Sequence, residues 1–494
     1  MIRLVTLFLC LLLLPSLALA GKEPPPRRVL KLDLETALQD ALRRNFSIEV
    51  QRIDSKIAGE GVRRELGQFD PVFNITATRD ETTNRDVFNN GVQLQSRNIS
   101  RLDRLSSGIS GVTAWGAKYD FGYGSRGNTG NTGLLGDLYD TTGSLSLTQP
   151  LLRGAGTAVT LAQVRIARNA AKVSEWQLRK QVIDVLTQTS DAYNELQLSI
   201  ENLRVAERSR GLARQLLKDN QARVEIGVKS PLEVTEARAA AAAREEDVIR
   251  GQRAVMNNEN FLKQLVTGDL LEMLETRLEI DPPPSPRFTG DVRGGIADAL
   301  AMRPDYRQAL LDLDRRHIQV VVQKNQLLPR IDLTGSLALL GLDNDSEGSF
   351  SRIGRRDQTA WSAGVIFSIP LGNREASASL RQARLEVAKS LLAIEALEQQ
   401  IIVDVDNAVG QIVTSQESIT TSRVARRLAR ESLDAGEERL RAGTGTTFEV
   451  LELQKKLSDA EALEHKSTST YNKSVARYHQ DTGTTLREHN VVLE

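Results

Sequence analysis

Two long stretches without proline constrain the fold of this chain more than any other feature. Pro150 is followed by no proline until Pro231, and no proline follows Pro370. Both stretches are rich in Ala, Leu, Glu, Arg, Gln and Lys, which are strong helix formers. They predict helices over about 157–222 and 375–440, each about 100 Å long at about 1.5 Å per residue. Helices of this length require coiled-coil-like packing against other helices.

A shared motif stands at the end of each predicted helix. Residues 223–234 read Arg-Val-Glu-Ile-Gly-Val-Lys-Ser-Pro-Leu-Glu-Val, and residues 439–450 read Arg-Leu-Arg-Ala-Gly-Thr-Gly-Thr-Thr-Phe-Glu-Val. Gly227 and Gly443 occupy the same place in the two motifs and suit the C-cap of a helix. The Ser-Pro and Thr-Thr pairs that follow suit the cap and first turn of a returning helix. Each glycine therefore predicts the tip of an antiparallel helical hairpin.

Further matches show that the chain is duplicated. Residues 41–76 match 299–334 without a gap, and each half ends in Thr-Gly. Gln-Pro-Leu at 149–151 also matches Ile-Pro-Leu at 369–371. Ordered matches of this kind indicate repeated structure. We predict two homologous halves, 21–285 and 286–494, joined by a proline-rich stretch.

The first 20 residues predict a signal peptide. Arg3 precedes an apolar run, and Ala18-Leu-Ala20 provides a small-x-small cleavage site. Cys10 is the only cysteine, and it lies inside the apolar run after a leucine, which disfavours lipidation. A membrane anchor is the alternative, although the run is shorter than the ~20 residues of a spanning helix. We expect export to the periplasm or beyond.

Four short segments alternate between apolar and small polar residues, as strands with two different faces do. They lie at 73–78, 144–148, 331–339 and 362–369. A barrel strand between lipid and a wet lumen gives this pattern, and so does a half-buried soluble sheet. The export signal, together with polar loops at about 80–140 and 341–348, favours the barrel.

The first polar loop contains another alternating pair, 107–113 and 118–123, around Trp115. It has no counterpart in the second half. It predicts a β-hairpin that either extends outside the membrane or adds to the wall, and the sequence leaves both open. Four strands cannot close a barrel, and an open edge cannot face lipid. We therefore expect the barrel to be completed by oligomerisation.

Composition argues against several other functions. Lys and Arg number 64 and Asp and Glu number 64, whereas nucleic-acid binders are usually basic. One cysteine and four histidines exclude a clustered zinc site. Gly154-Ala-Gly156 and Gly443-Thr-Gly445 lack the spacing and the lysine of a phosphate-binding loop. We expect no enzymatic activity, no cofactor, no metal and no nucleic-acid partner.

At this point the sequence resembles the TolC family of outer-membrane efflux proteins over about 31–485. The resemblance rests on the duplicated halves, on Leu-Thr-Gln-Pro-Leu at 147–151, on both tip motifs and on Ser-Leu-Asp-Ala at 432–435. It implies an α+β membrane protein in which a long antiparallel α-helical coiled-coil barrel joins a trimeric 12-stranded β-barrel. Each protomer would contribute four strands.

The resemblance also implies a function and partners. The protein would be a passive gated conduit of a tripartite efflux or type I secretion system, in the outer membrane with a large periplasmic part. A periplasmic adaptor and an inner-membrane pump or ABC transporter would be its partners, and outer-membrane lipid would surround it. A periplasmic coiled-coil adaptor or scaffold is the alternative.

The family pattern further implies site residues. Carboxylates at the pore constriction would be Glu449 and Glu452, with Glu233 and Glu236 at the matching positions of the first half; the alternative is that they are solvated helix-face residues. The tips that dock the adaptor would comprise Ile226, Gly227, Val228, Lys229, Ser230, Ala442, Gly443, Thr444, Gly445 and Thr446. The family has a basic gate residue where this chain has Gly445, so Arg439 or Arg441 would substitute, or the resting pore is held differently.

Overall fold

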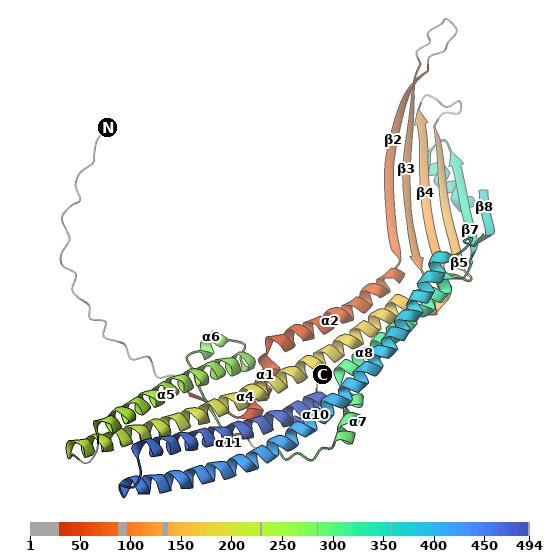
Figure 1. Ribbon diagram of the computed structural model, residues 1–494. Helices are drawn as coiled ribbons and strands as arrows, with labels where there is room; N and C mark the ends of the chain where they lie inside the picture. Colours follow the sequence, from red (N-terminus) through yellow and green to blue (C-terminus); the bar gives the residue numbers. More distant parts are fainter. Residues whose placement is uncertain are drawn as a thin grey trace, which may run out of the picture.

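A curved β-sheet stands at one end of a long helical bundle, and two helical tips form the other end (Figure 1). This computed structural model describes residues 29–86, 96–130, 137–227, 230–283, 285–356 and 358–492. The predicted signal peptide and its Cys10, as well as Val228 and Lys229 of the first tip, lie outside the described residues.

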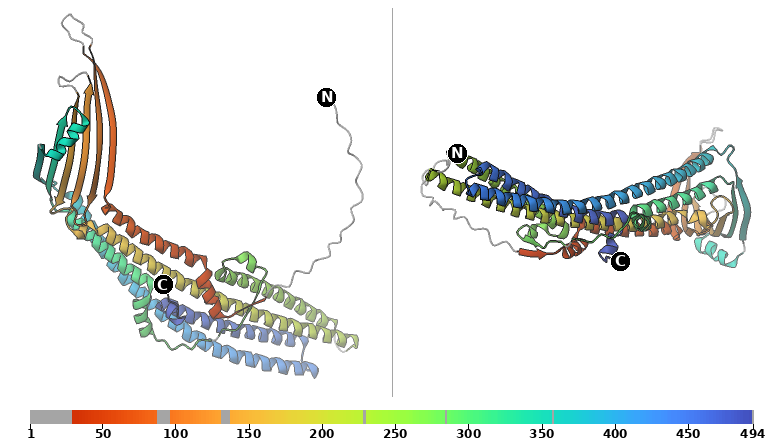
Figure 2. Two further views of the ribbon diagram at one scale, coloured as in Figure 1. Left: turned by 180° about the vertical axis from the view of Figure 1, so that it is seen from behind. Right: turned by 60° about the horizontal axis from the view of Figure 1, so that its bottom comes forward.

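Two helical hairpins make up most of the bundle. Helix α4 (Ala162–Glu225) has 64 residues and returns as α5 (Pro231–Val266). Helix α10 (Arg374–Arg441) has 68 residues and returns as α11 (Thr447–Thr482). These bounds confirm the two long helices predicted from the proline-free stretches. In Figures 1 and 2 the two hairpins run side by side toward the tips.

Six strands form one antiparallel sheet in the order β2-β3-β4-β5-β7-β8. Their bounds are β2 Val72–Asp86, β3 Ser96–Val112, β4 Lys118–Gly130, β5 Leu138–Pro150, β7 Arg330–Asp343 and β8 Gln358–Ser368. The expectation of four strands per chain is therefore wrong in number. The hairpin around Trp115 supplies the other two, because β3 and β4 lie between β2 and β5 and pair with both.

The two faces of the sheet differ in polarity, as the alternation predicted. Register places most of the large apolar side chains of the six strands on one face, where most of them are exposed, while Leu340, Leu342 and Ile366 lie on the other face. This apolar face comprises Phe73, Ile75, Leu105, Ile109, Tyr119, Phe121, Leu145, Leu147, Leu333, Leu337, Trp361, Val365 and Phe367. The opposite, polar face includes Asn74, Thr76, Ser110, Asp120, Ser144, Ser146, Thr334, Ser336 and Ser362.

The order of the strands is repeated by the helices below them. Helix α2 (Phe46–Leu66) leads through the short helix η1 (Gly67–Phe69) into β2, and β5 leads through α3 (Thr157–Thr160) into α4. Helix α8 (Pro304–Gln326) leads into β7, and β8 leads into α10. Contacts join α2 to α4, α4 to α8 and α8 to α10. A row of four helices thus continues the sheet (Figure 2).

Several small elements pack against the sheet and the bundle. Strands β1 (Val29–Leu32) and β6 (Arg277–Ile280) pair in parallel, and α9 (Ser346–Arg355) packs across β5 and β7. The remaining helices are α1 (Leu34–Arg44), α6 (Leu270–Met273), α7 (Val292–Met302) and α12 (Thr485–Glu488). Among the described residues, no helix has both the length and the apolar character required to cross a membrane.

Two buried tyrosines hold the linker between the halves. The Tyr193 hydroxyl donates to the carbonyl oxygens of Asp281 at 2.7 Å and Leu32 at 3.1 Å. The Tyr471 hydroxyl donates to the carbonyl oxygen of Pro286 at 2.7 Å. Because an unpaired buried carbonyl costs about 1–3 kcal/mol, these bonds favour one path for the linker across the bundle.

A polar seam joins α4 to α11. The Asn472 amide donates to the side-chain oxygen of Asn194 at 3.0 Å, and the Ser469 hydroxyl donates to the Asn194 carbonyl at 3.4 Å. Asp191 lies one helical turn from this pair. Desolvation raises the pKa of Asp191 from 3.8 to about 6, against the attraction of Lys473 and Arg477. At neutral pH the ionised carboxylate of Asp191 therefore lowers the free energy of unfolding of the chain.

We predict that Asp191→Asn raises the melting temperature at neutral pH. A folded-state pKa above the unfolded value means that the folded chain binds more protons between about pH 4 and pH 6, so stability falls as pH rises through that window. Removing the charge should add on the order of 1–3 kcal/mol above this window and nothing below it. Circular dichroism melts at several pH values measure the difference.

The matched control is Asp219→Asn, which removes an exposed carboxylate from the same helix. It should shift the melting temperature little at any pH. If Asp191→Asn left the pH dependence of melting as it is in the original chain, the buried carboxylate would not be the cause.

Candidate functional site

The tips are built as the repeated motif predicts. Gly227 and Gly443 follow their helices with φ of 76° and 78°. In this left-handed region a residue with a Cβ is strained, and a Cβ at either position would meet no atom within 4 Å. Backbone conformation, not lack of space, therefore requires glycine. Ser230 caps α5 by accepting from Leu232 N at 3.3 Å, and Thr446 caps α11 by accepting from Glu449 N at 3.1 Å.

The turn of the second tip explains why Gly445 has no side chain. The Arg439 carbonyl accepts from the amides of Thr444 at 2.9 Å and Gly445 at 3.1 Å. This turn folds back on the end of α10, so a Cβ on Gly445 would lie 3.0 Å from Leu440 N and 3.2 Å from Arg439 C. Any larger residue would require the backbone to shift. Ala442 and Thr444 are exposed on the same turn.

The four candidate glutamates do not have equivalent surroundings. Glu449, on the first turn of α11, forms an ion pair with Arg439 across the hairpin. Glu452 is exposed one turn further along. Glu233 is half-buried and accepts a hydrogen bond from the Thr447 hydroxyl at 2.5 Å, while Glu236 is half-buried on α5. Arg441, the other candidate gate residue, pairs with Glu437 on its own helix at 3.4 Å.

A buried hydrogen-bond link joins the two tips. Thr447 is 0% exposed and Asn220 is 1% exposed, and the Asn220 amide donates to the Thr447 hydroxyl at 3.1 Å. The same amide lies 3.4 Å from the Glu233 carbonyl oxygen, and Thr447 donates to the Glu233 carboxylate. Asn220 is on α4, Glu233 on α5 and Thr447 on α11, so the link holds both hairpins together near their ends.

Three large apolar side chains are exposed at the tips. Ile226 is 74% exposed, Leu232 64% and Phe448 62%. Sequence reasoning included Ile226 but missed Leu232 and Phe448. The signal was present, because Leu232 and Phe448 occupy the same position in the repeated tip motif. Exposed apolar side chains at the tips are candidates for contact with another protein.

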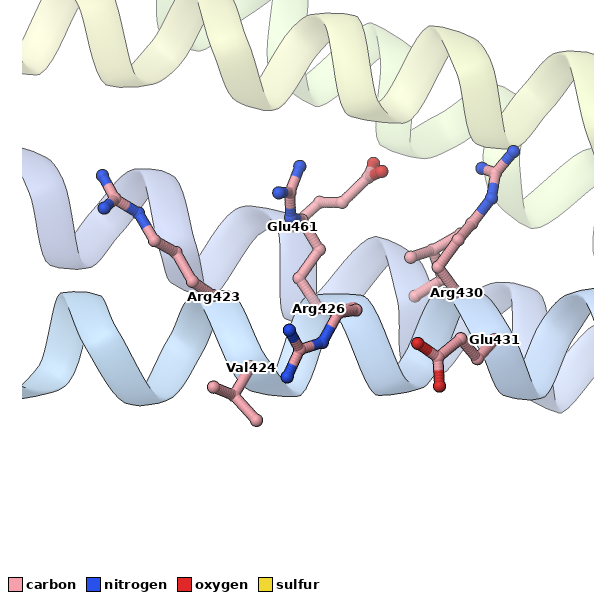
Figure 3. Close-up of a pocket in the computed structure, with 8 residues that line it drawn as sticks. Arg423, Val424, Arg426, Arg430, Glu431 and Glu461 are labelled. Carbon is pink, nitrogen blue, oxygen red and sulfur yellow. The ribbon is translucent and has the colours of Figure 1, made fainter.

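Sequence reasoning also missed a basic stripe on α10. Arg423, Arg426, Arg427 and Arg430 recur with helical spacing and line a groove with Glu461 of α11. Figure 3 shows Arg423, Arg430 and Glu461 extending to the same side of the helix pair. Glu464 lies 2.7 Å from Arg426 and 3.5 Å from Arg423, so one carboxylate serves two guanidinium groups. The stripe gives this part of the bundle an excess of positive charge.

The described residues contain no group of three or more His, Cys, Asp or Glu side chains that could hold a metal ion. The tips present carboxylates, an arginine and apolar side chains on a rigid turn. Such a surface can attract ions and bind a partner protein.

We predict that Thr447→Val loosens the connection between the two tips. Valine keeps the shape of threonine but removes the hydroxyl that Asn220 and Glu233 both contact, which should cost about 1–3 kcal/mol locally. Amide hydrogen exchange should accelerate around 220–227, 230–234 and 447–450. Thr444→Val is the control, since that side chain is exposed and its hydroxyl donates to the nearby Arg439 carbonyl at 3.3 Å. Equal exchange in the two variants would contradict the link.

The family model for outer membrane efflux proteins matches residues 117–268 and 295–484, more than half of the chain. Nodulation protein T of Rhizobium leguminosarum bv. trifolii is 30% identical over 182 residues. That match covers 36% of this chain and 37% of the relative, so it spans well under half of the relative's length.

Solved outer-membrane channels share the fold. The Campylobacter jejuni CmeC channel gives a TM-score of 0.69 at 16% identity, covering 92% of this chain and 86% of that one. The Vibrio cholerae protein VceC gives 0.66 at 16% identity, covering 91% and 96%. The open MtrE channel of Neisseria gonorrhoeae gives 0.61 at 17% identity, covering 93% and 90%.

The family consists of channels and not of enzymes, which agrees with the absence of catalytic chemistry expected from the sequence. The resemblance to TolC-like proteins is confirmed, and with it the expected outer-membrane localisation. The chain belongs to the outer membrane efflux protein family.

Proposed function

We propose that this protein is the outer-membrane channel of a tripartite efflux or type I secretion system. It is a homotrimeric, passive, gated conduit from the periplasm to the exterior. The observation that carries the proposal is the apolar face of a sheet in which four strands, β2, β5, β7 and β8, are joined to a row of four helices. One end suits lipid and the other suits water, as a conduit between two compartments requires.

The two edges of the sheet support assembly with further copies of the chain. Strands β2 and β8 end the order of strands and pair on one side only. Unpaired backbone groups in lipid cost several kcal/mol each, so the edges must be closed. Copies of the same chain, joined β8 to β2, close the sheet into a barrel. The row of helices α2, α4, α8 and α10 then closes into a periplasmic tunnel.

The constriction lies at the tips, where Glu449 and Glu452 form two stacked rings of carboxylates in a trimer. These rings attract cations. Arg439 offsets part of the charge of Glu449 within each hairpin. Glu233 belongs to the link between the tips, and Glu236 adds a weaker negative contribution beside it.

A periplasmic adaptor binds the tips and connects them to an inner-membrane pump or ABC transporter. The exposed side chains of Ile226, Leu232 and Phe448 favour contact with a partner that also buries apolar surface. The alternative, a periplasmic scaffold, does not explain a six-stranded sheet with an exposed apolar face, because such a face is unfavourable in water.

Channel function is tested with purified protein in planar bilayers. Heat-modifiable trimers from outer-membrane fractions should conduct, and Glu449→Gln with Glu452→Gln should lower the cation-to-anion permeability ratio severalfold because six carboxylates leave the pore. Glu246→Gln, an exposed change on α5, is the control and should leave selectivity as it is. Unchanged selectivity in the double variant would exclude these residues from the pore, and a monomer that stays soluble without detergent would exclude the conduit.

Adaptor docking is tested at the glycines of the tips. Gly227→Glu and Gly443→Glu place bulk and charge on the docking surface and should abolish export while trimers still reach the outer membrane. Gly227→Asn and Gly443→Asn are the controls, because asparagine tolerates the left-handed conformation at about 1 kcal/mol or less. They should retain export. Loss of trimers in the Glu variants would show instead that these glycines serve folding.

A further inference from the structure

The hairpin formed by β3 and β4 is fully integrated into the sheet. The register pairs Val72 of β2 with Ser110 of β3, and Lys118 of β4 with Thr148 of β5. The hairpin therefore starts at the same level as its neighbours on the helical side. Strand β3 pairs with β2 from Val72↔Ser110 to Asp86↔Ser96, which is the full length of β2. A hairpin that only extended the sheet outward would begin beyond its neighbours.

The same hairpin shares the polarity of the sheet. Ile109 and Phe121 are paired across β3 and β4, and they lie on the apolar face between Phe73 of β2 and Leu145 of β5. Ser110 and Asp120 are paired on the polar face. The side chains of Ile109 and Phe121 are 43% and 53% exposed in the single chain. The apolar surface is thus continuous from β2 to β8.

The turn of the hairpin is fixed to the start of the helical bundle. Thr113 N donates to the Ala117 carbonyl at 2.8 Å, and Gly156 N donates to the Trp115 carbonyl at 3.1 Å. Gly116 has a φ of 95°, and a Cβ there would lie 2.6 Å from the Gly154 carbonyl oxygen. The turn therefore sits in close contact with the loop between β5 and α4.

We infer that the transmembrane barrel has eighteen strands, six from each of three copies. This inference rests on the trimer of the proposed function and replaces the twelve strands that the resemblance implied. Both strands of the hairpin face lipid on one side and the lumen on the other. Every strand from β2 to β8 in the sheet is a wall strand.

A comparison of the circumferences of the helical tunnel and of the β-barrel supports eighteen strands rather than twelve. Twelve helices spaced about 9 Å apart enclose a ring of about 110 Å. Eighteen strands about 4.8 Å apart and tilted by about 40° also enclose about 110 Å, whereas twelve enclose about 75 Å. Two extra strands above α2 and α4 let the barrel meet the tunnel without narrowing. The exit then admits any solute that the tunnel admits, including bulky cargo, and selection by size is left to the tips.

Cysteine labelling in the outer membrane tests the assignment, since Cys10 is the only cysteine and precedes the predicted cleavage site. Single-cysteine variants Ser110→Cys and Asp120→Cys place a thiol on the lumen side of β3 and β4. Ile109→Cys and Phe121→Cys place it on the lipid side. Ser144→Cys and Leu145→Cys report the same contrast for β5, a strand that both barrel sizes include. A membrane-impermeant maleimide is the probe, applied to whole cells and to isolated outer membranes.

The lumen-side variants should react roughly tenfold or more faster than the lipid-side variants, because the reactive thiolate does not form in hydrocarbon. The contrast in β3 and β4 should match that in β5. If β5 showed the contrast while both faces of β3 and β4 reacted equally fast, the hairpin would stand outside the wall and the inference would be overturned. If β5 also lacked it and no trimers were found, the proposed function would fail as well.

Discussion

The structure depends on the continuity of α4 and α10, which run unbroken from the sheet to the tips. A long helix transmits its rotation and position over its whole length, so the sheet and the tips are placed by the same two elements. The bundle around them is joined by contacts that fix register as well as proximity. The Asn472 amide reaches the side-chain oxygen of Asn194 only when α4 and α11 are correctly aligned. Apolar packing alone would tolerate sliding between such long helices.

Local features of the fold were predictable because their causes are local. Helix-forming composition gave the two long helices, and the φ values of Gly227 and Gly443 follow from a motif that ends each helix in the same way. Strand alternation gave the two faces of the sheet. It did not give the order of the strands, because alternation defines which face a side chain takes and not which strand lies beside it. The place of β3 and β4 therefore required the structure.

In the candidate site, too, the local features were predictable from the sequence and the contacts between distant residues were not. The glutamates after each tip could be found from the repeat, but the bond from Thr447 to Glu233 joins residues 214 positions apart. No spacing rule connects the two halves in that way. The equivalence of Leu232 and Phe448 could be read from the sequence, since the repeat aligns them. The sequence alone does not show that both side chains are exposed, because an apolar residue on the first turn of a helix can equally pack into a core.

The sizes of the individual interactions indicate which of them hold the two tips together in a chain with glycine at position 445. Arg439 pairs with Glu449, but both side chains are partly exposed, and such pairs contribute about 0–1 kcal/mol. Beside them, Leu216 of α4 packs with Leu433, Leu440, Val450 and Leu457 of the second hairpin. Each of these buried side chains contributes about 1.5–3 kcal/mol. Apolar packing between α4 and the α10–α11 hairpin therefore outweighs the ion pair. Opening that moved the second hairpin away from α4 would work chiefly against this packing and against the Asn220–Thr447 bond.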